Sequence, residues 1–549
     1  MKLKFRVAMV LALALSLAWA TGASAALTVF NSRVPAGFGM LGYIQDATVT
    51  NAANPNSGGT LTINGIKMIV PANTVIQMPA NTLKWADLFN PLVYNPVRDP
   101  LLPAQPVLAI TAGKTGLAMN DNAAQVQGLS PWLPFNASVE GNIDVKNATG
   151  NGGGAYIVGL ILPIDQDLEN TGQGFVTYID YAKGRFEVGG LLNTPNTGTV
   201  IEINDPLGRF GWAHSPDPRW SVDSDNPTVT TGNGYPMGLP KQPAPGVDPD
   251  RPYWNRPLNP AIGAPGHDPF LQAGAPLQAF FMPARSAPNP PGVNTPDPWR
   301  QVPIMVGDYV DFAGVLCKNI PTAPINPLIP WRQQTYISAH TVGSDKLAVY
   351  TASGSLATTG PAYMSLARMV VGTGGVSITV PPDPARGILG GVIPLPEPRL
   401  NTIIHGWCTD STSLVDIYAV DVNPVTGVET NRLLGTVLPE PGLAGGKGNK
   451  GRFRFDIGKG NFQPTTRTYR VMTRHGQIQL GNQIGLKGAP LAGLRSGQYT
   501  APMFTFQFAD AAPGFPVMPN NFNNMPFLFQ GEGGNPSVGP LVPFPPFQP

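Results

Sequence analysis

The abundance of glycine and proline limits most strongly what this chain can fold into. Its 549 residues include 64 glycines and 62 prolines. Proline lacks a backbone donor and breaks helix interiors, and glycine weakens them. Helical periodicity is almost absent, whereas short alternating apolar stretches bounded by Gly, Asn and Asp recur along the chain. The sequence therefore predicts an all-β protein with long Pro-rich irregular segments.

The clearest local signal is the stretch GGTLTINGIKMIVPANTVIQMPA at residues 58–80. Asn64-Gly65 favours a type I′ turn, because both central residues need a positive φ. This two-residue loop places Ile63 opposite Ile66 and puts the apolar side chains on one face. An isolated hairpin is at best marginally stable in water, so the pattern predicts one piece of a larger sheet.

Five further strand patterns follow between residues 137 and 205, and a second series begins near residue 399. The first group, with the hairpin, predicts a small antiparallel barrel or sandwich, and the later group has the spacing of an immunoglobulin-like sandwich. The predicted organisation is 1–25 signal peptide, 26–213 first barrel-like domain, 214–269 Pro-rich ordered linker, 270–397 second barrel-like domain, 398–480 immunoglobulin-like sandwich and 481–549 Pro/Phe-rich strap or tail.

A weak internal repeat supports two barrel-like domains. VEGNI precedes AYIVGLIL in the first domain, and FAGVL precedes TYISAHTV in the second. Both copies place a glycine, Gly141 or Gly314, before a strand that opens with Tyr-Ile at Tyr156 or Tyr336. The gaps differ between the copies, so chance resemblance between two β-domains is the alternative.

The first 25 residues have a basic start, an apolar run and small residues at Ala23 and Ala25, which is typical of a secretory signal peptide. The formal net charge of the whole chain is +2, and charged residues make up 12%. Because no basic stripe could neutralise phosphates, nucleic acid is not an expected partner. No later segment is long and apolar enough to span a membrane, so we expect a secreted, extracellular, cell-surface or periplasmic protein.

Cys317 and Cys408 are the two cysteines of the chain, and each lies in a strand-like apolar run. An exported chain reaches an oxidising compartment, so one disulfide is an alternative. Buried free cysteines behave as small apolar residues and are common in cores. We predict that both are unpaired and buried.

Two stretches carry a family resemblance. The pattern GTLTINGI resembles small single-barrel domains of unknown function in exported bacterial proteins. The run INDPLGRFG, followed by SVDSDNPTVTTGNGYPMGLP, resembles a signature of secreted β-rich proteins of bacteria and fungi. The resemblance covers about residues 40 to 480 and implies a β-rich fold and an exported location, and it carries no catalytic residue.

The densest acidic group, SPDPRWSVDSDNP, contains the candidate metal ligands Asp217, Asp223 and Asp225. Calcium prefers several oxygen ligands, and a rigid Pro-rich loop could hold them. The loop lacks the glycine and distal glutamate of an EF-hand, and Asp is also a common turn former. Weak calcium binding is therefore the one cofactor hypothesis, and a purely structural loop is its alternative.

The sequence contains no Gly-x-Ser-x-Gly elbow, His-Glu-x-x-His helix or Cys-x-x-Cys pair. Our main hypothesis is a non-enzymatic protein that binds an extracellular polymer or protein, or associates with itself. The alternative is a secreted polysaccharide hydrolase, which needs two carboxylates from separate strands. The carboxylates considered for it are Glu202, Asp205, Asp223 and Asp308, with the sugar-stacking rings Trp212, Trp220 and Trp254.

Overall fold

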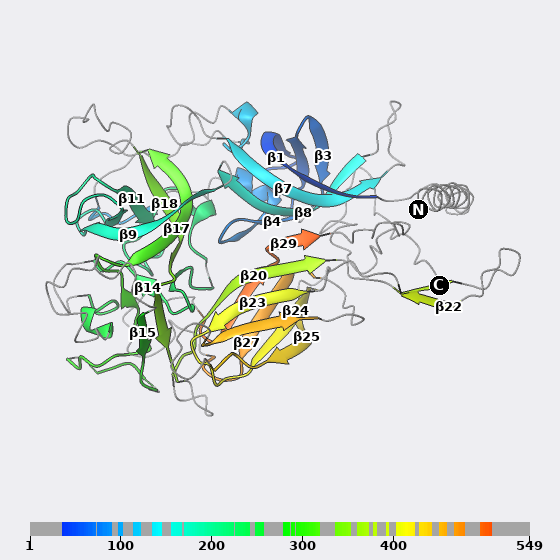
Figure 1. Ribbon diagram of the computed structural model, residues 1–549. Helices are drawn as coiled ribbons and strands as arrows, with labels where there is room; N and C mark the ends of the chain where they lie inside the picture. The colour runs from blue at the N-terminus through cyan, green and yellow to red at the C-terminus, as the bar shows by residue number, and fades with distance from the viewer. Residues whose placement is uncertain are drawn as a thin grey trace, which may run out of the picture.

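The computed structural model describes residues 36–72, 74–90, 97–102, 113–121, 134–144, 155–166, 169–223, 225–241, 248–256, 278–285, 287–290, 292–318, 335–352, 360–372, 377–380, 391–394, 402–422, 428–441, 450–457, 466–477 and 495–507. The protein is all-β, as predicted: within these ranges there are strands and short 3-10 helices, and no α-helix. The predicted signal peptide lies outside the described residues. Figure 1 shows two curved sheets side by side above a layered third unit.

The first sheet forms a closed five-stranded barrel. The predicted hairpin is confirmed, because Ile63 pairs with Ile66 around Asn64-Gly65, whose φ angles are 52° and 76°. Its second strand closes the barrel by pairing in parallel with β8. The sheet contains β1 (Ala36–Val49), β2 (Gly59–Ile63), β3 (Ile66–Val70), β7 (Phe135–Asp144) and β8 (Ala155–Gln166), extended by β4 (Val75–Gln77) and β5 (Thr82–Lys84).

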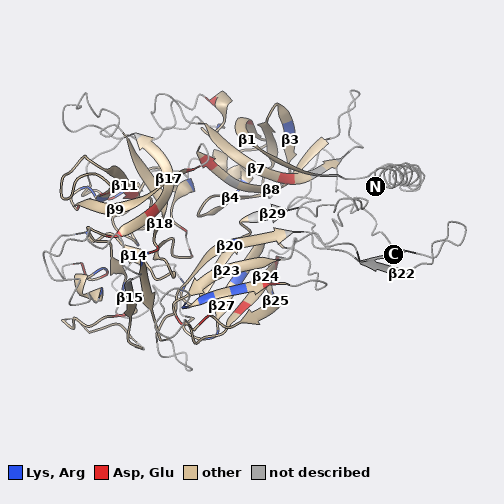
Figure 2. Cartoon of the chain, in the orientation of Figure 1, with Lys and Arg blue, Asp and Glu red and all other residues tan. Residues whose placement is uncertain are grey.

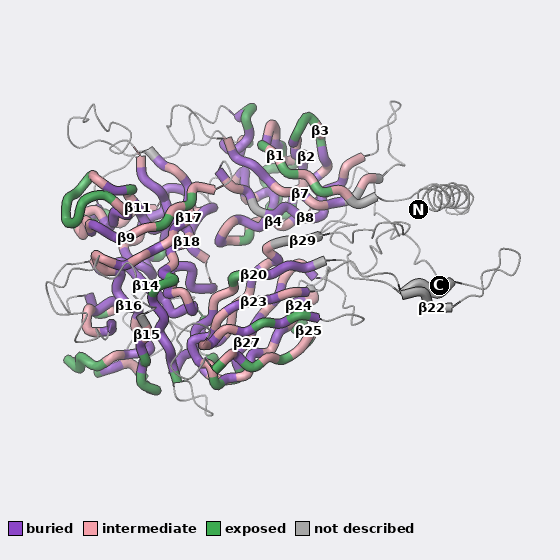
Figure 3. Tube along the Cα trace, in the orientation of Figure 1, coloured by how far each residue is buried: buried purple, intermediate pink, exposed green. Residues whose placement is uncertain are grey.

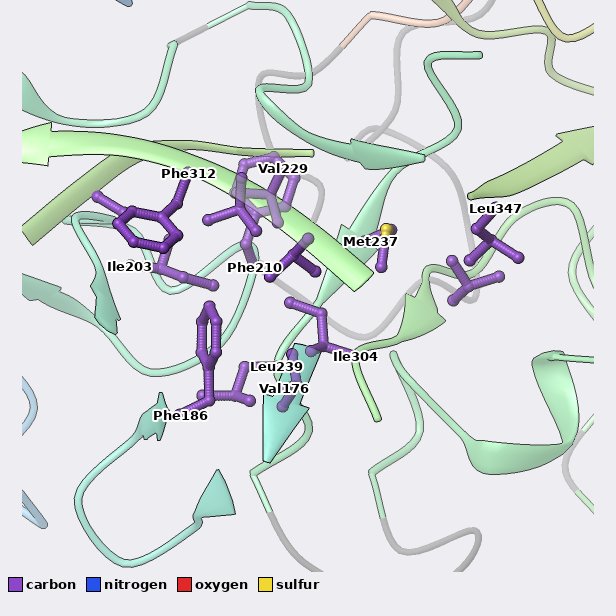
Figure 4. Close-up of a cluster of buried hydrophobic side chains, with 14 of the residues drawn as sticks. Val176, Phe186, Ile203, Phe210, Val229, Met237, Leu239, Ile304, Phe312 and Leu347 are labelled. Atoms are coloured by element: carbon purple, nitrogen blue, oxygen red, sulfur yellow. The ribbon is translucent and has the colours of Figure 1, made fainter. Parts of the chain in front are cut away.

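The second sheet forms another closed barrel, from two groups of strands that lie far apart in the sequence. Strands β9 to β11 pair with β17 and β18, and β11 closes the barrel by pairing in parallel with β18. Its core is shown in Figure 4, where Phe186, Phe210 and Phe312 meet aliphatic side chains. The sheet contains β9 (Asn170–Asp180), β10 (Arg185–Val188), β11 (Thr199–Ile203), β17 (Tyr309–Lys318), β18 (Thr335–Ser344) and an added β13 (Val229–Thr231).

The two barrels have the same connectivity. Numbered along each barrel, the strands follow the closed order 1-2-3-5-4, with strands 3 and 5 parallel and the other pairs antiparallel. This is the connectivity of the OB-type Greek-key barrel. The sequence repeat thus corresponds to strands 4 and 5 of each barrel.

The repeated glycines have equivalent roles. Gly141 in β7 and Gly314 in β17 both lie at a β-bulge, where the register shifts opposite strand 5. A Cβ atom on Gly141 would lie 2.1 Å from the carbonyl oxygen of Ile157, and one on Gly314 would lie 2.3 Å from that of Ser338. Each barrel therefore needs glycine here so that its fourth strand can bend closely over the fifth.

The third unit consists of two four-stranded sheets that enclose one core. Alternate residues of β23 (Ile404, Cys408) and β24 (Val415, Ile417, Ala419) point into this core. An immunoglobulin-like topology stays a prediction. One sheet contains β26 (Arg452–Asp456), β23 (Ile403–Cys408), β20 (Met364–Gly372) and β29 (Thr505–Gln507), and the other contains β25 (Glu429–Val437), β24 (Val415–Val422), β27 (Thr468–Thr473) and β28 (Gln498–Pro502).

Strand β8 joins the core of the first barrel to the core of the sandwich. Val158 and Ile161 point into the first barrel, whereas Ile157, Leu160 and Leu162 belong to the core of the sandwich. A strand covered on both faces has no need for polar alternation, which accounts for the continuous apolar run AYIVGLIL. Figure 3 shows this burial along the barrel strands, with exposed residues gathered at turns.

The sheets cross the domain boundaries predicted from the sequence. Strands β9 to β11, placed in the predicted domain 26–213, belong to the second barrel. Strand β20 of the predicted domain 270–397 pairs with β23 of the sandwich, and β28 and β29 come from the predicted tail 481–549. Strand patterns are local, whereas these pairings join segments separated by long insertions. The described part of the tail therefore completes the sandwich, and residues 508–549 lie outside the described residues.

The second-barrel insertion, residues 204–308 between β11 and β17, contains the Pro-rich segment, and its described part has a recurring motif in which Asp precedes Pro and an Arg follows. Each Asp accepts the backbone N–H two residues later, at 3.0 to 3.1 Å, and binds the Arg guanidinium. A buried charge needs such a partner. The pairs are Asp217 with Arg219 at 2.8 Å, Asp248 with Arg251 at 3.1 Å and Asp297 with Arg300 at 3.2 Å.

The two cysteines are free and buried, as predicted. They lie in different cores, Cys317 beside the first barrel and Cys408 in the sandwich.

Short strand pairs and turns complete the fold. The remaining elements are β6 (Val97–Arg98) with β12 (His214–Ser215), β14 (Met237–Gly238) with β16 (Val302–Pro303), β15 (Gln278–Phe281) with β19 (Leu347–Tyr350), β21 (Ser377–Val380) with β22 (Gly391–Pro394), and the 3-10 helices η1 (Trp85–Phe89), η2 (Met119–Asp121), η5 (Pro218–Trp220) and η6 (Tyr253–Asn255).

Candidate binding site at the first turn of the second barrel

The turn between β9 and β10 is the most distinctive half-exposed feature of the second barrel. Asp180 ends β9. Its carboxylate accepts two hydrogen bonds from Lys183, one from the backbone N–H at 3.1 Å and one from the ammonium group at 2.9 Å. Gly184 then adopts a φ of 66°, a left-handed conformation that suits glycine. In OB-type barrels the loop between strands 1 and 2 is one of the ligand-binding loops. The turn therefore places Tyr181 and Lys183 where such barrels meet ligands.

Aromatic side chains surround this turn. The Tyr181 hydroxyl lies 2.8 Å from the Tyr253 hydroxyl, and burial together with this hydrogen bond raises the pKa of Tyr181. The Trp212 ring lies directly over Gly184, where a Cβ atom would be 2.3 Å from Cδ1 of the indole. Tyr181, Trp212 and Tyr253 are all half-buried, so part of each ring reaches the surface.

Cationic groups lie over two of the indole rings. The Lys241 ammonium is 5.3 Å from the centre of the Trp212 ring, and the Arg300 guanidinium is 5.8 Å from that of Trp254. Arg300 is itself fixed by Asp297. In the described part of the chain the buried indole N–H of Trp212 has no hydrogen-bond acceptor. We call Tyr181, Trp212 and Tyr253, together with Trp254, which follows Tyr253 in the chain, the aromatic site.

The aromatic site can bind a ligand that has both apolar faces and hydroxyl groups. Tyrosine and tryptophan combine a large apolar ring with a polar group, and they suit surfaces that are partly wet. Lys183, Lys241 and Asp180 supply hydrogen-bond donors and acceptors beside the rings. A sugar ring presents the same combination of a C–H face and an edge of hydroxyls.

The candidate calcium ligands are engaged in structural contacts. The Asp217 carboxylate holds Arg219, whose guanidinium also reaches the carbonyl oxygens of Leu88 and Thr115. No group of three or more His, Cys, Asp or Glu suited to a metal ion occurs among the described residues. Calcium binding by Asp217, Asp223 and Asp225 stays a prediction.

The rest of the acidic loop docks the second-barrel insertion onto the sandwich. Asp223 accepts the backbone N–H groups of Asp225 and Asn226, at 2.7 and 2.9 Å. Asn226 thereby meets the backbone of Thr500 in β28, with hydrogen bonds of 2.7 and 3.0 Å. Burial raises the pKa of Asp223 to about 6.

The other carboxylates considered for hydrolysis are also engaged. Asp205 accepts the backbone N–H groups of Leu207 and Phe210, at 3.1 and 2.6 Å, and so shapes the turn after β11. Asp308 forms an ion pair with Arg256 at 2.5 Å. Asp205 and Asp223 both lie near Arg209, whose guanidinium is 3.9 Å from the Asp205 carboxylate, whereas Asp308 pairs with Arg256.

Glu202 lies in a buried charged cluster at the junction of the two barrels. Its carboxylate binds the Arg185 guanidinium at 2.6 Å, lies 3.7 Å from Arg98 and contacts Nδ1 of His214. Arg185 also lies over the ring of Tyr336, at 4.2 Å. Burial, reinforced by the two arginines against the effect of Glu202, lowers the pKa of His214 to about 4. The neutral imidazole and the two arginines stabilise one buried carboxylate, which is a structural role.

A second acidic group lies where the first barrel connects to the second. Glu169 begins the connection into β9 with a φ of 73°, a rare value for a non-glycine residue, and lies 3.3 Å from Nε2 of His340. Burial, followed by the charge of Glu169, raises the pKa of Asp165 to about 7. Burial lowers the pKa of His340 to about 4.

The sequence predicts part of the aromatic site. Of the three rings expected to stack on sugar, Trp212 and Trp254 are half-exposed, whereas Trp220 is 1% exposed and donates its indole N–H to the carbonyl oxygen of Ile164, so it cannot stack on a ligand. The sequence does not predict Tyr181. Its signal is the turn Tyr-Ala-Lys-Gly between two strand patterns, but only the fold brings Tyr253 and Trp212 to that turn.

Comparison of the chain with protein-family models and curated proteins, and of its structure with solved structures, finds no match. Within the described ranges, no helix has the length and apolar character that a membrane span requires.

Proposed function

We propose that this is a secreted or cell-surface, non-enzymatic protein that binds an extracellular polysaccharide through the aromatic site. The observation that carries the proposal is the arrangement of Tyr181, Trp212 and Tyr253 around the first turn of an OB-type barrel. Half-exposed aromatic rings on a chain with few charges favour a neutral, ring-containing ligand.

The surrounding structure supports a pre-formed site. The segment that carries Tyr253 and Trp254 is fixed by the buried pair of Asp248 and Arg251. Asn255 adds hydrogen bonds to the backbone carbonyls of Arg300 and Gln301, at 2.9 and 3.1 Å. A site that is rigid before binding loses less conformational entropy when a ligand arrives. The backbone that carries Tyr253 and Trp254 is therefore in place before a ligand binds.

The test is affinity electrophoresis in native gels that contain a soluble β-glucan, xylan, mannan or α-glucan. We expect at least one polysaccharide to retard the protein, and Trp254→Ala and Gly184→Ala to weaken retardation at least tenfold. Gly184→Ala acts by displacing the Trp212 ring. The matched control is Phe281→Ala, which removes an exposed ring, 64% accessible, outside the aromatic site. Retardation that is lost equally in the Phe281 variant, or absent with every polysaccharide, contradicts the proposal.

The alternative function is a polysaccharide hydrolase, and one observation favours it. Asp165 and Glu169 lie at the end of β8 and the start of β9, burial raises the pKa of both carboxyl groups, and Glu169 pairs with His340. A carboxyl group that stays protonated near neutral pH is suited to act as a general acid. Release of reducing sugar from the same polysaccharides, abolished in a folded Asp165→Asn variant, would favour this alternative.

A further inference from the structure

One outer face of the sandwich carries a row of basic side chains across three neighbouring strands. In the β20-β23-β26 sheet, Arg368 pairs directly with His405, and His405 pairs directly with Arg454. Their neighbours along the strands, Ile404 and Phe453, are buried in the core. Because side chains alternate across a strand, the three basic groups point away from that core.

A second row lies beside the first on the same face. Ser365 pairs with Trp407, and Trp407 pairs with Arg452. Trp407 is half-exposed, whereas Arg452 and Arg454 keep 43% and 64% of their side chains accessible. Figure 2 shows blue segments, which are arginines, on strands of the sandwich. We call these two rows, Arg368-His405-Arg454 and Ser365-Trp407-Arg452, the basic face.

The basic face puts a histidine directly between two arginines. Like charges on paired strands repel one another, so this register disfavours the charged form of the imidazole. His405 is the point of greatest crowding: burial, then the charges of Arg454 and Arg368, lower its pKa. Among the described residues its buried Nε2 atom has no hydrogen-bond partner. Packing of the sandwich gives no reason for this arrangement.

The acidic residues nearby only partly compensate. Glu440 binds Arg452 at 2.7 Å, and Asp456 lies 3.5 Å from Arg454. No acidic side chain within the described ranges forms an ion pair with Arg368. On the opposite sheet of the same sandwich, Arg432 binds Asp421 and Arg474 binds Asp416. The basic face therefore differs chiefly in Arg368, an exposed arginine that pairs with His405 and has no acidic partner among the described residues.

We infer that the basic face binds an acidic polysaccharide, one that carries carboxylate or sulfate groups. Arginine forms paired hydrogen bonds with such groups, and the Trp407 ring offers a flat surface for a sugar between them. Neighbouring strands are about 4.8 Å apart, so the row from Arg368 to Arg454 spans about 10 Å. That length fits successive charges on a polymer better than one small anion.

This inference is independent of the aromatic site, which lies on the second barrel and favours neutral sugar. A nucleic acid fits the basic face less well. Such partners need a broad stripe of Lys and Arg, whereas this face offers three arginines on a chain of nearly balanced charge. A sulfated or carboxylated sugar needs fewer contacts.

The experiment measures binding of dextran sulfate to the full chain by isothermal titration at low salt. We expect saturable binding that the double variant Arg368→Gln/Arg454→Gln weakens at least tenfold, and that Trp407→Ala weakens about threefold. The control is Arg432→Gln on the opposite sheet, which should bind as the parent does. Thermal unfolding shows that each variant is folded.

The protonation state of His405 gives a second, independent readout. The groups that face it are Arg368 on β20 and Arg452, Arg454 and Asp456 on β26. A bound polyanion offsets the arginines, so the pKa of His405 should rise in the complex, and binding should be tighter at pH 5.5 than at pH 7.5. The imidazole resonances in NMR spectra, assigned with a His405→Asn variant, measure this pKa.

Several outcomes overturn the inference. Unmodified dextran binding as tightly as dextran sulfate would show that charge is not recognised. Equal weakening by Arg432→Gln would show non-specific attraction, and tighter binding of a single-stranded oligonucleotide would point to nucleic acid. Loss of neutral-polysaccharide retardation in the Trp254 variant does not bear on this face, so the two proposals fail separately.

Discussion

The two barrels share one strand order, yet the segments inserted between their third and fourth strands differ. In the first barrel residues 71–134 fill this position, and the described part places Trp85, Leu88 and Phe89 in the barrel core. In the second barrel residues 204–308 do so, and they add the buried Asp–Arg pairs and most of the aromatic site. Barrel closure is thus common to both, whereas the insertion decides which surface is available for binding.

The comparison predicts that the greatest loss of stability follows from breaking the contact between the two insertions. Arg219 is fully buried and joins Asp217 of the second insertion to the carbonyl oxygens of Leu88 and Thr115 in the first. Arg219→Met leaves a buried carboxylate without its partner, and we expect a loss of about 3–5 kcal/mol in the free energy of unfolding. Urea denaturation measures it. Arg432→Met, at a partly exposed pair, is the control and should change little; an equal loss in both variants would refute the role of the junction.

The bulge glycines test whether the barrels are equivalent. A Cβ atom at Gly141 or Gly314 would collide with a backbone carbonyl of strand 5, so each Ala variant should lose about 1–3 kcal/mol. Gly211→Ala is the control, because its Cβ would lie 3.5 Å from the nearest atom. Thermal and urea unfolding of the three variants measure these differences. A large loss in the free energy of unfolding at one bulge with none at the other would show that the two barrels share a strand order but differ in geometry at the bulge.

A pH-dependent difference is expected at the residue before each bulge, Glu140 in the first barrel and Ala313 in the second. Burial raises the pKa of Glu140 from 4.5 to about 7, and one of its oxygens is buried without a hydrogen-bond partner among the described residues. Between these two pKa values the folded chain holds a proton that the unfolded chain releases. The free energy of unfolding therefore falls as the pH rises from 4.5 to about 7.

The Glu140→Gln variant has no carboxyl group at this position, so it should not lose stability as the pH rises. We expect the variant and parent to be equally stable at pH 4, and the variant to be about 2 kcal/mol more stable at pH 8. Urea denaturation at both pH values measures the difference. A variant that is equally stabilised at pH 4 would trace the effect to packing instead of ionisation.

The smallest expected effect concerns the cysteines, one beside the barrels and one in the sandwich. Burial raises the pKa of both the Cys317 and Cys408 thiols, so neither reacts readily in the folded chain. We expect the melting temperature to be unchanged by a reducing agent, and a thiol reagent to label both residues only after unfolding. A mass gain of two hydrogens on reduction would instead reveal a disulfide.

Much of the local structure follows from short-range chemistry. Asn64-Gly65 predicts its hairpin because few residues tolerate two successive positive φ angles, and the alternation around it sets the register. The glycine before Tyr-Ile marks strand 4 of both barrels. The aromatic site could be predicted only in part, because Trp212 and Trp254 stand out as rings while nothing local connects them with Tyr181.

The sequence by itself determined the all-β class, the positions of turns and strands, and the presence of two similar units. Turn chemistry and two-residue alternation act over a few residues, so they are readable along the chain. Only the tertiary structure decided that β9 to β11 close a barrel with β17 and β18, and that Arg219 and Trp212 meet partners from distant segments. Those contacts depend on closing long loops, and the entropic cost of closing a loop grows only slowly with its length. Loops of many lengths are therefore tolerated, so the contacting segments have no fixed spacing in the sequence.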